Sequence, residues 1–120
     1  MQFNKIIASA LMAFSFLASP AMAEKVSINM DEVKYALGMQ RNMGGYIRLS
    51  GVLTDILRVM KTEFTKKPSA ADNAAAQQAE DLLNEAGLAA SQDDFDESFA
   101  IMEKASGVIL GAIDRFNAQN

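Results

Sequence analysis

The chain has 120 residues and a formal net charge of −4 at pH 7, and it contains no Cys, no His and no Trp. Without Cys and His, the usual catalytic triads, the usual zinc sites and thiol redox chemistry are excluded, and we expect no enzyme. The acidic balance argues against nucleic acid and anionic membranes as partners.

The first 23 residues have the pattern of a cleaved secretory signal peptide. Lys5 supplies the positive start, residues 6–17 form an apolar run, and Ala21-Met22-Ala23 is a small-x-small cleavage site. The alternative is a membrane anchor, but the run is shorter than the roughly 20 residues that a spanning helix needs. We therefore expect a periplasmic protein, cleaved after Ala23 and free of the membrane. Its single domain, residues 24–120, carries a charge of −5 because Lys5 is lost.

The first helix of this domain is predicted to start at Asn29-Met30. Asn29 stands three residues before Glu32, which is the spacing of a helix cap, and acidic residues suit the first turn. Gly44-Gly45 weakens the helical pattern, so we place a turn between two antiparallel helices there. One unbroken helix from Met30 to Phe64 is the alternative, since no Pro enforces a break.

Two further helices follow in the middle of the chain. The second is predicted from Tyr46 to Thr65, with Pro68 after it as a stop. Ser69 has the spacing to cap the third helix, and Gly87 is its expected end. The third helix has a face of small residues, which lets another helix approach closely: Ala71, Ala75, Ala79 and Ala86, with Leu82 and Leu83 beside them.

The last helix opens after Ser91 and is the most strongly patterned part of the chain. Its apolar seam has the spacing of a helix packed in a bundle: Phe95, Phe99, Met102, Ile109, Ile113 and Phe116, with Ser106 in the series. No segment alternates with the period of a strand. The sequence predicts an all-α, antiparallel up-and-down four-helix bundle.

Two candidate metal sites can be read from the residues alone. The acidic stretch from Asp93 to Glu97 lacks the spacing and the glycine of a calcium loop, so we interpret it as a solvated helix start. Met39 and Met43 are predicted to lie one helical turn apart, and thioethers select Cu(I), so this pair is a candidate copper site. The alternative for these methionines is core filling.

The chain resembles a known family in several places. The export signal, the four antiparallel helices and Asn29-Met30 near the start of the mature chain resemble the periplasmic cytochrome b-562 family. The stretch 53–60, LTDILRVM, is similar to the second helix of that family, whereas residues 33–46 look more like the first helix of the related cytochromes c-prime. The b-562 resemblance implies an electron-transfer bundle in which Met30 is one axial ligand of haem b.

The same resemblance places the other haem ligands at apolar positions. Aligning the last aromatic of either family with Phe116 puts the iron-binding His at Ile113, and the two attachment cysteines of the c-prime group at Ile109 and Ala112. Met102 or Met60 would be needed as a second ligand if haem were still held. The positions at which these families bind or attach haem are therefore hydrophobic in this sequence.

Three functional hypotheses remain open at this point. The first is a haem-binding electron-transfer protein that uses Met30, and it predicts an open cavity beside Met30. The second, which we favour, is a bundle without standard haem ligation and most simply without a cofactor. It acts as a small binding or interaction module for an unknown periplasmic protein or redox partner. It predicts that no room is left for a porphyrin, because five residues pack together: Met30, Leu37, Ile109, Ile113 and Phe116. A bundle that shields other proteins or binds a small apolar ligand is a further possibility, which the sequence does not separate from the second hypothesis. The third is copper binding by Met39 and Met43.

Overall fold

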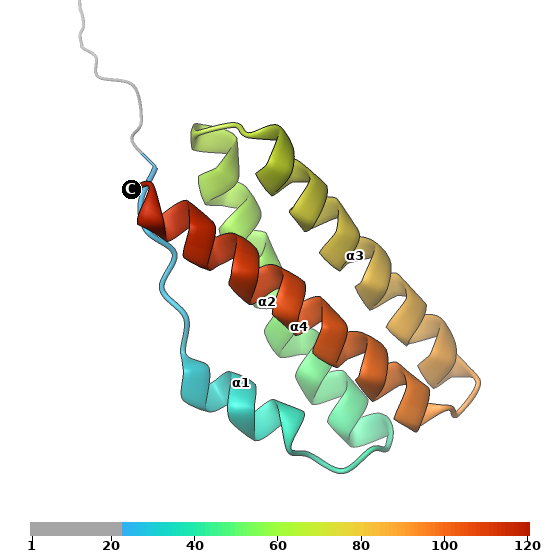
Figure 1. The fold of residues 1–120 in the computed structure, drawn as a ribbon. Helices are drawn as coiled ribbons and strands as arrows, with labels where there is room; N and C mark the ends of the chain where they lie inside the picture. The colour runs from blue at the N-terminus through green and yellow to red at the C-terminus, as the bar shows by residue number, and fades with distance from the viewer. Residues whose placement is uncertain (1–22) are drawn as a thin grey trace, which may run out of the picture.

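The computed structural model describes residues 23–120, which form four helices packed as a bundle (Figure 1). They are α1 (Met30–Leu37), α2 (Met43–Lys66), α3 (Ala70–Ser91) and α4 (Phe95–Ala118). Successive helices run in opposite directions, and the described residues contain no strand. The prediction of an all-α four-helix bundle is confirmed. The predicted signal peptide lies outside the described residues except for Ala23.

Each helix begins with a polar side chain that accepts a hydrogen bond from the backbone N–H three residues further on. These N-caps are Asn29, Asn42, Ser69 and Asp94. The caps satisfy one of the backbone donors that a helix start leaves unpaired. The predicted starts at Asn29 and Ser69 are confirmed, whereas α4 is capped by Asp94, at the acidic stretch itself.

The turn between the first two helices lies earlier than predicted. α1 ends at Leu37, the connection spans residues 38–42, and α2 starts at Met43. The predicted turn at Gly44-Gly45 is wrong, and so is the alternative of one helix from Met30 to Phe64. Gly45 is buried in the first turn of α2, where a Cβ would overlap the carbonyl oxygen of Gln40 and lie 3.0 Å from the ring of Phe99. The glycine permits close packing here and does not end a helix.

Gly87 likewise does not end α3, which continues to Ser91. A Cβ at Gly87 would lie 3.1 Å from the hydroxyl oxygen of Tyr46. The chain reverses instead at residues 92–94, where Asp93 adopts a positive φ of 60°, a conformation that Asp tolerates better than most residues. The predicted end at Gly87 is wrong because close helix packing, not helix termination, requires the glycine.

The predicted seam of α4 forms the centre of the core. Phe99, Met102, Ser106, Ile109, Ile113 and Phe116 are all buried, while Phe95 at the helix start is only half-buried. At one end of the bundle, the rings of Phe64 and Phe116 lie with their centroids 4.8 Å apart. α3 and α4 pack over the longest stretch of the bundle. The small side chains of α3 allow the close approach: Ala75, Ala76, Ala79, Ala86 and Ala90 are buried.

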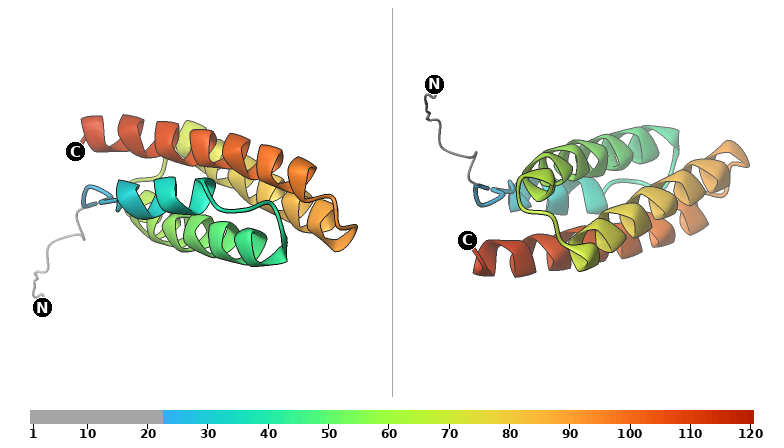
Figure 2. Two further views of the ribbon diagram at one scale, coloured as in Figure 1. Left: turned by 90° about the horizontal axis from the view of Figure 1, so that it is seen from below. Right: turned by 90° about the horizontal axis from the view of Figure 1, so that it is seen from above.

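The fourth corner of the bundle is built from α1 together with the extended chain before it. α1 has only 8 residues and packs on α2. The preceding residues 24–28, which we call the N-terminal strap, run from the end of α4 toward α1 (Figures 1 and 2). Val26 of the strap is buried, and the side-chain amide of Asn117 holds its backbone at both N–H and C=O. The strap therefore occupies the space that a longer first helix would fill.

Candidate binding pocket

Met30 and Ile113, the two positions that the haem resemblance singles out, line the same pocket. It lies between the strap, the start of α1 and the last two turns of α4, and it has a volume of about 300 Å³. This volume is at the lower end of the range for small-molecule sites. Seven residues line it, five of them apolar and two polar: Val26, Ile28, Met30, Leu110, Ile113, Asp114 and Asn117.

The two positions differ sharply in exposure. Met30 is 40% exposed and stands at the rim, whereas Ile113 is 1% exposed and belongs to the core cluster. Leu37 is half-buried against that cluster. The structure thus contains open space beside Met30, as the haem hypothesis predicts. Ile113 is packed in the core, as the binding-module hypothesis predicts. That hypothesis is wrong about Met30, however, because this side chain borders the pocket instead of packing with Ile113.

The donor atoms at the pocket do not fit a haem iron held from both sides. Met30 contributes the only sulfur among the lining residues, and the chain has no His. Met60 and Met102, the candidate second ligands, are 0% exposed in the core and do not line the pocket. Standard haem ligation needs a strong axial ligand on the second side, such as an imidazole.

One of the two polar lining residues is fully used by the fold. Asn117 accepts a 2.8 Å hydrogen bond from the Val26 N–H with Oδ1, and its Nδ2 donates a 2.9 Å bond to the Val26 carbonyl. Asp114 is exposed at the edge of the pocket. The pocket therefore has a mixed surface that is only slightly more apolar than polar. That surface suits a small molecule with an apolar body, and the lining residues include no nucleophile paired with a base.

The methionines of the copper hypothesis do not lie one helical turn apart. Met39 is half-buried in the connection after α1, and Met43 is the first residue of α2. The geometric premise of that hypothesis is therefore wrong, and copper binding by Met39 and Met43 stays a prediction. The acidic stretch 93–97 is the start of α4, and no cluster of three or more Cys, His, Asp or Glu suited to a metal occurs among residues 23–120.

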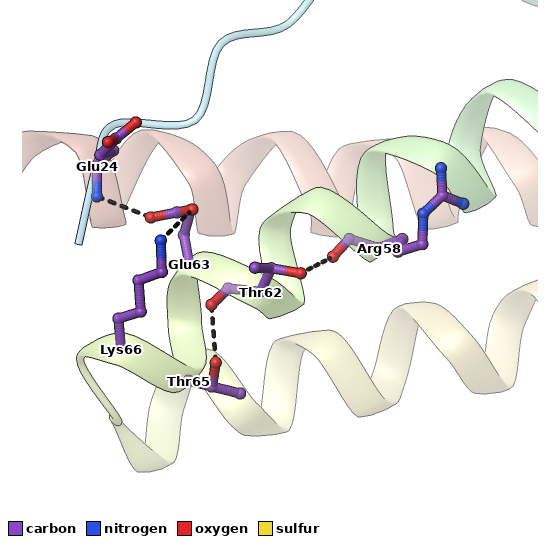
Figure 3. A network of polar contacts seen from close by, with 6 residues as sticks. All are labelled: Glu24, Arg58, Thr62, Glu63, Thr65 and Lys66. Atoms are coloured by element: carbon purple, nitrogen blue, oxygen red, sulfur yellow. Dashed lines mark hydrogen bonds and ion pairs between the residues drawn. The ribbon is translucent and has the colours of Figure 1, made fainter. Parts of the chain in front are cut away.

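A larger groove that the sequence did not reveal lies between α2 and α3. Its volume is about 500 Å³. Its charged groups are already paired, since Arg58 is 3.0 Å from Asp55 and Lys61 is 3.0 Å from Glu80. Two of its hydroxyls, those of Thr62 and Thr65, donate to backbone carbonyls of their own helix (Figure 3). The groove has no set of free polar groups that converge on a ligand.

Sequence reasoning also missed a polar contact at the start of the strap. The backbone N–H of Glu24 donates a 2.8 Å hydrogen bond to Oε1 of Glu63, and Lys66 Nζ lies 3.1 Å from Oε2 of the same carboxylate (Figure 3). The hydrogen bond from Glu24, followed by the contact with Lys66, lowers the pKa of Glu63 from its ordinary value of 4.5. The residues are 39 positions apart, so no local pattern could predict the contact.

Comparison of the chain with protein-family models, with curated proteins and with solved structures finds no match. The likeness to cytochrome b-562 therefore depends on the sequence pattern and the four-helix architecture alone. Within residues 23–120, no helix has both the length and the apolar character needed to cross a membrane.

Proposed function

We propose that this protein is an exported, non-catalytic binding module of the cytochrome b-562 type that does not use standard haem ligation. Its ligand site is the pocket beside Met30, and the ligand is a small apolar molecule. The single observation that carries the proposal is the pocket itself, which is lined mainly by apolar residues and is open at the position where the resemblance would place haem.

The chemistry of the walls supports an apolar ligand. Ile28 and Leu110 present hydrocarbon, with the buried Ile113 behind them, and the Met30 thioether is a flexible, polarisable group that adapts to irregular ligand shapes. Burying apolar surface contributes roughly 25 cal/mol for each Å² removed from water. A pocket of this size therefore supports modest affinity for a compact molecule and has no need of a metal.

A neutral fluorescent probe, N-phenyl-1-naphthylamine, tests the proposal. We expect its emission to rise on binding, and the methyl resonances of Met30 and Ile113 to shift in NMR spectra. Leu110→Trp should fill the pocket and abolish both effects, because Leu110 is a half-buried lining residue. Leu88→Trp is the matched control, since Leu88 is 66% exposed and outside the pocket, and it should bind the probe normally. Unshifted Met30 and Ile113 methyls, or equal binding by both variants, would contradict the proposal.

Haem binding through Met30 is the second candidate, favoured by the open space beside that side chain. Titration with hemin separates the two. We expect no absorption spectrum of six-coordinate haem in either oxidation state. A Soret band that shifts on reduction and disappears in Met30→Ala would establish the haem-binding electron-transfer function instead.

A further inference from the structure

We propose that removal of the signal peptide creates a structural ion pair: the new α-amino group of Glu24 binds the carboxylate of Glu63 and locks the N-terminal strap onto the bundle. Since the strap forms one wall of the pocket beside Met30, processing of the chain also completes that wall. This second statement depends on the function proposed above, whereas the ion pair does not.

The geometry places the cleavage site directly at the contact. The predicted site follows Ala23, so the first nitrogen of the processed chain is that of Glu24. This nitrogen lies 2.8 Å from Oε1 of Glu63. The carboxylate is well positioned to receive a charge, because the Glu63 side chain is only 13% exposed and its other oxygen already contacts Lys66 at 3.1 Å. Each carboxylate oxygen therefore has its own donor.

Cleavage changes the chemistry of the Glu24 nitrogen. Hydrolysis of the Ala23–Glu24 peptide bond consumes one water and leaves a carboxylate on Ala23 and an amine on Glu24. An α-amino group has an ordinary pKa of about 7.7–8.0, so most of it is protonated at neutral pH. A neutral amide donor thus becomes an ammonium group, and hydrogen bonds between two charged groups are stronger than those with a neutral donor.

The strap has a second attachment only two residues further on. Both backbone groups of Val26 bond to Asn117 near the end of α4, and the Val26 side chain is 5% exposed in the core. The two attachments join the start of the strap to α2 and its middle to α4. Val26 and Ile28 of the strap line the pocket with Met30, so releasing Glu24 should loosen that wall.

The test uses the protein purified after export, with its first residue identified by mass spectrometry. We expect Glu24. Acetylation of the α-amino group under mildly acidic conditions, which leave the lysines unmodified, restores a neutral amide at this nitrogen. It should lower the thermal midpoint by a few degrees and accelerate hydrogen exchange of the Val26 amide. A first residue other than Glu24 would overturn the proposal.

Two substitutions isolate the pair. In Glu63→Gln, acetylation should no longer change the thermal midpoint or the exchange of Val26, because the charged partner is gone. Glu85→Gln is the matched control, since Glu85 is an exposed acid on α3, and it should respond to acetylation as the unmodified sequence does. An equal effect of acetylation in both variants would overturn the ion pair. None of these measurements requires a ligand, so their outcome does not depend on the proposed binding function.

Discussion

Replacing Gly45 by Ala should destabilise the protein even though the position is helical. Alanine is the better helix former, and at an unconstrained helical site the exchange stabilises by roughly 0.5–1 kcal/mol. At Gly45, however, the added methyl would overlap the Gln40 carbonyl oxygen and press on the ring of Phe99. The first obstacle is backbone, so the connection 38–42 must shift to make room.

The magnitude follows from these two opposing terms. Forcing an extra methyl into a packed site costs about 1–3 kcal/mol, which exceeds the gain in helix propensity, so we expect a net loss of about 1–2 kcal/mol. Gly44→Ala is the neighbouring control. Its Cβ would meet only the side-chain oxygen of Asn42, at an ordinary contact distance of 3.5 Å. This variant should therefore be unchanged or more stable by up to about 1 kcal/mol.

Urea unfolding followed by circular dichroism measures both variants. With a slope of about 1–3 kcal/mol per M for a small domain, the two midpoints should differ by roughly 0.5–2 M. The order matters most, since Gly45→Ala should lower stability whereas Gly44→Ala, in the same helical turn, should leave it unchanged or raise it. Equal stability of Gly45→Ala and Gly44→Ala would refute the close packing of the 38–42 connection on α2.

Three further tests concern the core, the strap and the contact between α3 and α4. Ile113→Asp buries an unpaired carboxylate and should cost several kcal/mol of unfolding free energy, whereas Met30→Ala at the pocket rim should cost only about 1 kcal/mol; similar urea midpoints would mean that Ile113 is not in the core. Because the folded-state pKa of Glu63 lies below 4.5, its ionised form stabilises the fold above pH 4.5, and this contribution is lost as the pH falls through the lowered pKa. Glu63→Gln should therefore lower the thermal midpoint at neutral pH and flatten its acid dependence, and parallel pH profiles would contradict the contact. Ser98→Ala removes a buried 2.8 Å hydrogen bond to the Ala86 carbonyl and should lower the free energy of unfolding by about 1 kcal/mol. An unchanged urea midpoint would contradict a stabilising role for this hydrogen bond.

The helices and the core of α4 could be predicted because their signals are local. The apolar spacing of α4 marks its buried face directly, and Phe99, Met102 and Ile109 are all 0% exposed. The caps at Asn29 and Ser69 are equally local, since each side chain bonds to a backbone group three residues away. Such features require no knowledge of which helices become neighbours.

The helix boundaries were predicted wrongly at glycines that make room for a neighbouring helix or loop. From the sequence alone, Gly45 and Gly87 look like helix breakers, because glycine lowers helix propensity. In the structure their missing Cβ atoms leave room for the Gln40 carbonyl and the Tyr46 hydroxyl. Both contacts depend on tertiary packing, so propensity alone gave the wrong helix boundaries.

The pocket was only partly predictable for the same reason. The resemblance pointed to Met30 and Ile113, and both line it. The strap residues Val26 and Ile28 were not assigned to the site, because an extended segment has no periodic signal. Val26 is placed by Asn117, which is 91 residues away in the chain.

Because the first helix is short, the strap must cover part of the bundle core. An eight-residue helix rises only about 12 Å, whereas α2 and α4 each have 24 residues, so α1 covers only part of the groove between them. The strap fills part of the remainder with Val26, but extended chain has no internal hydrogen bonds, so its buried backbone groups need partners elsewhere. Asn117 and Glu63 provide those bonds from two different helices. A binding pocket walled by such a segment depends on both attachments, which is why the charge of the Glu24 nitrogen should matter to the fold.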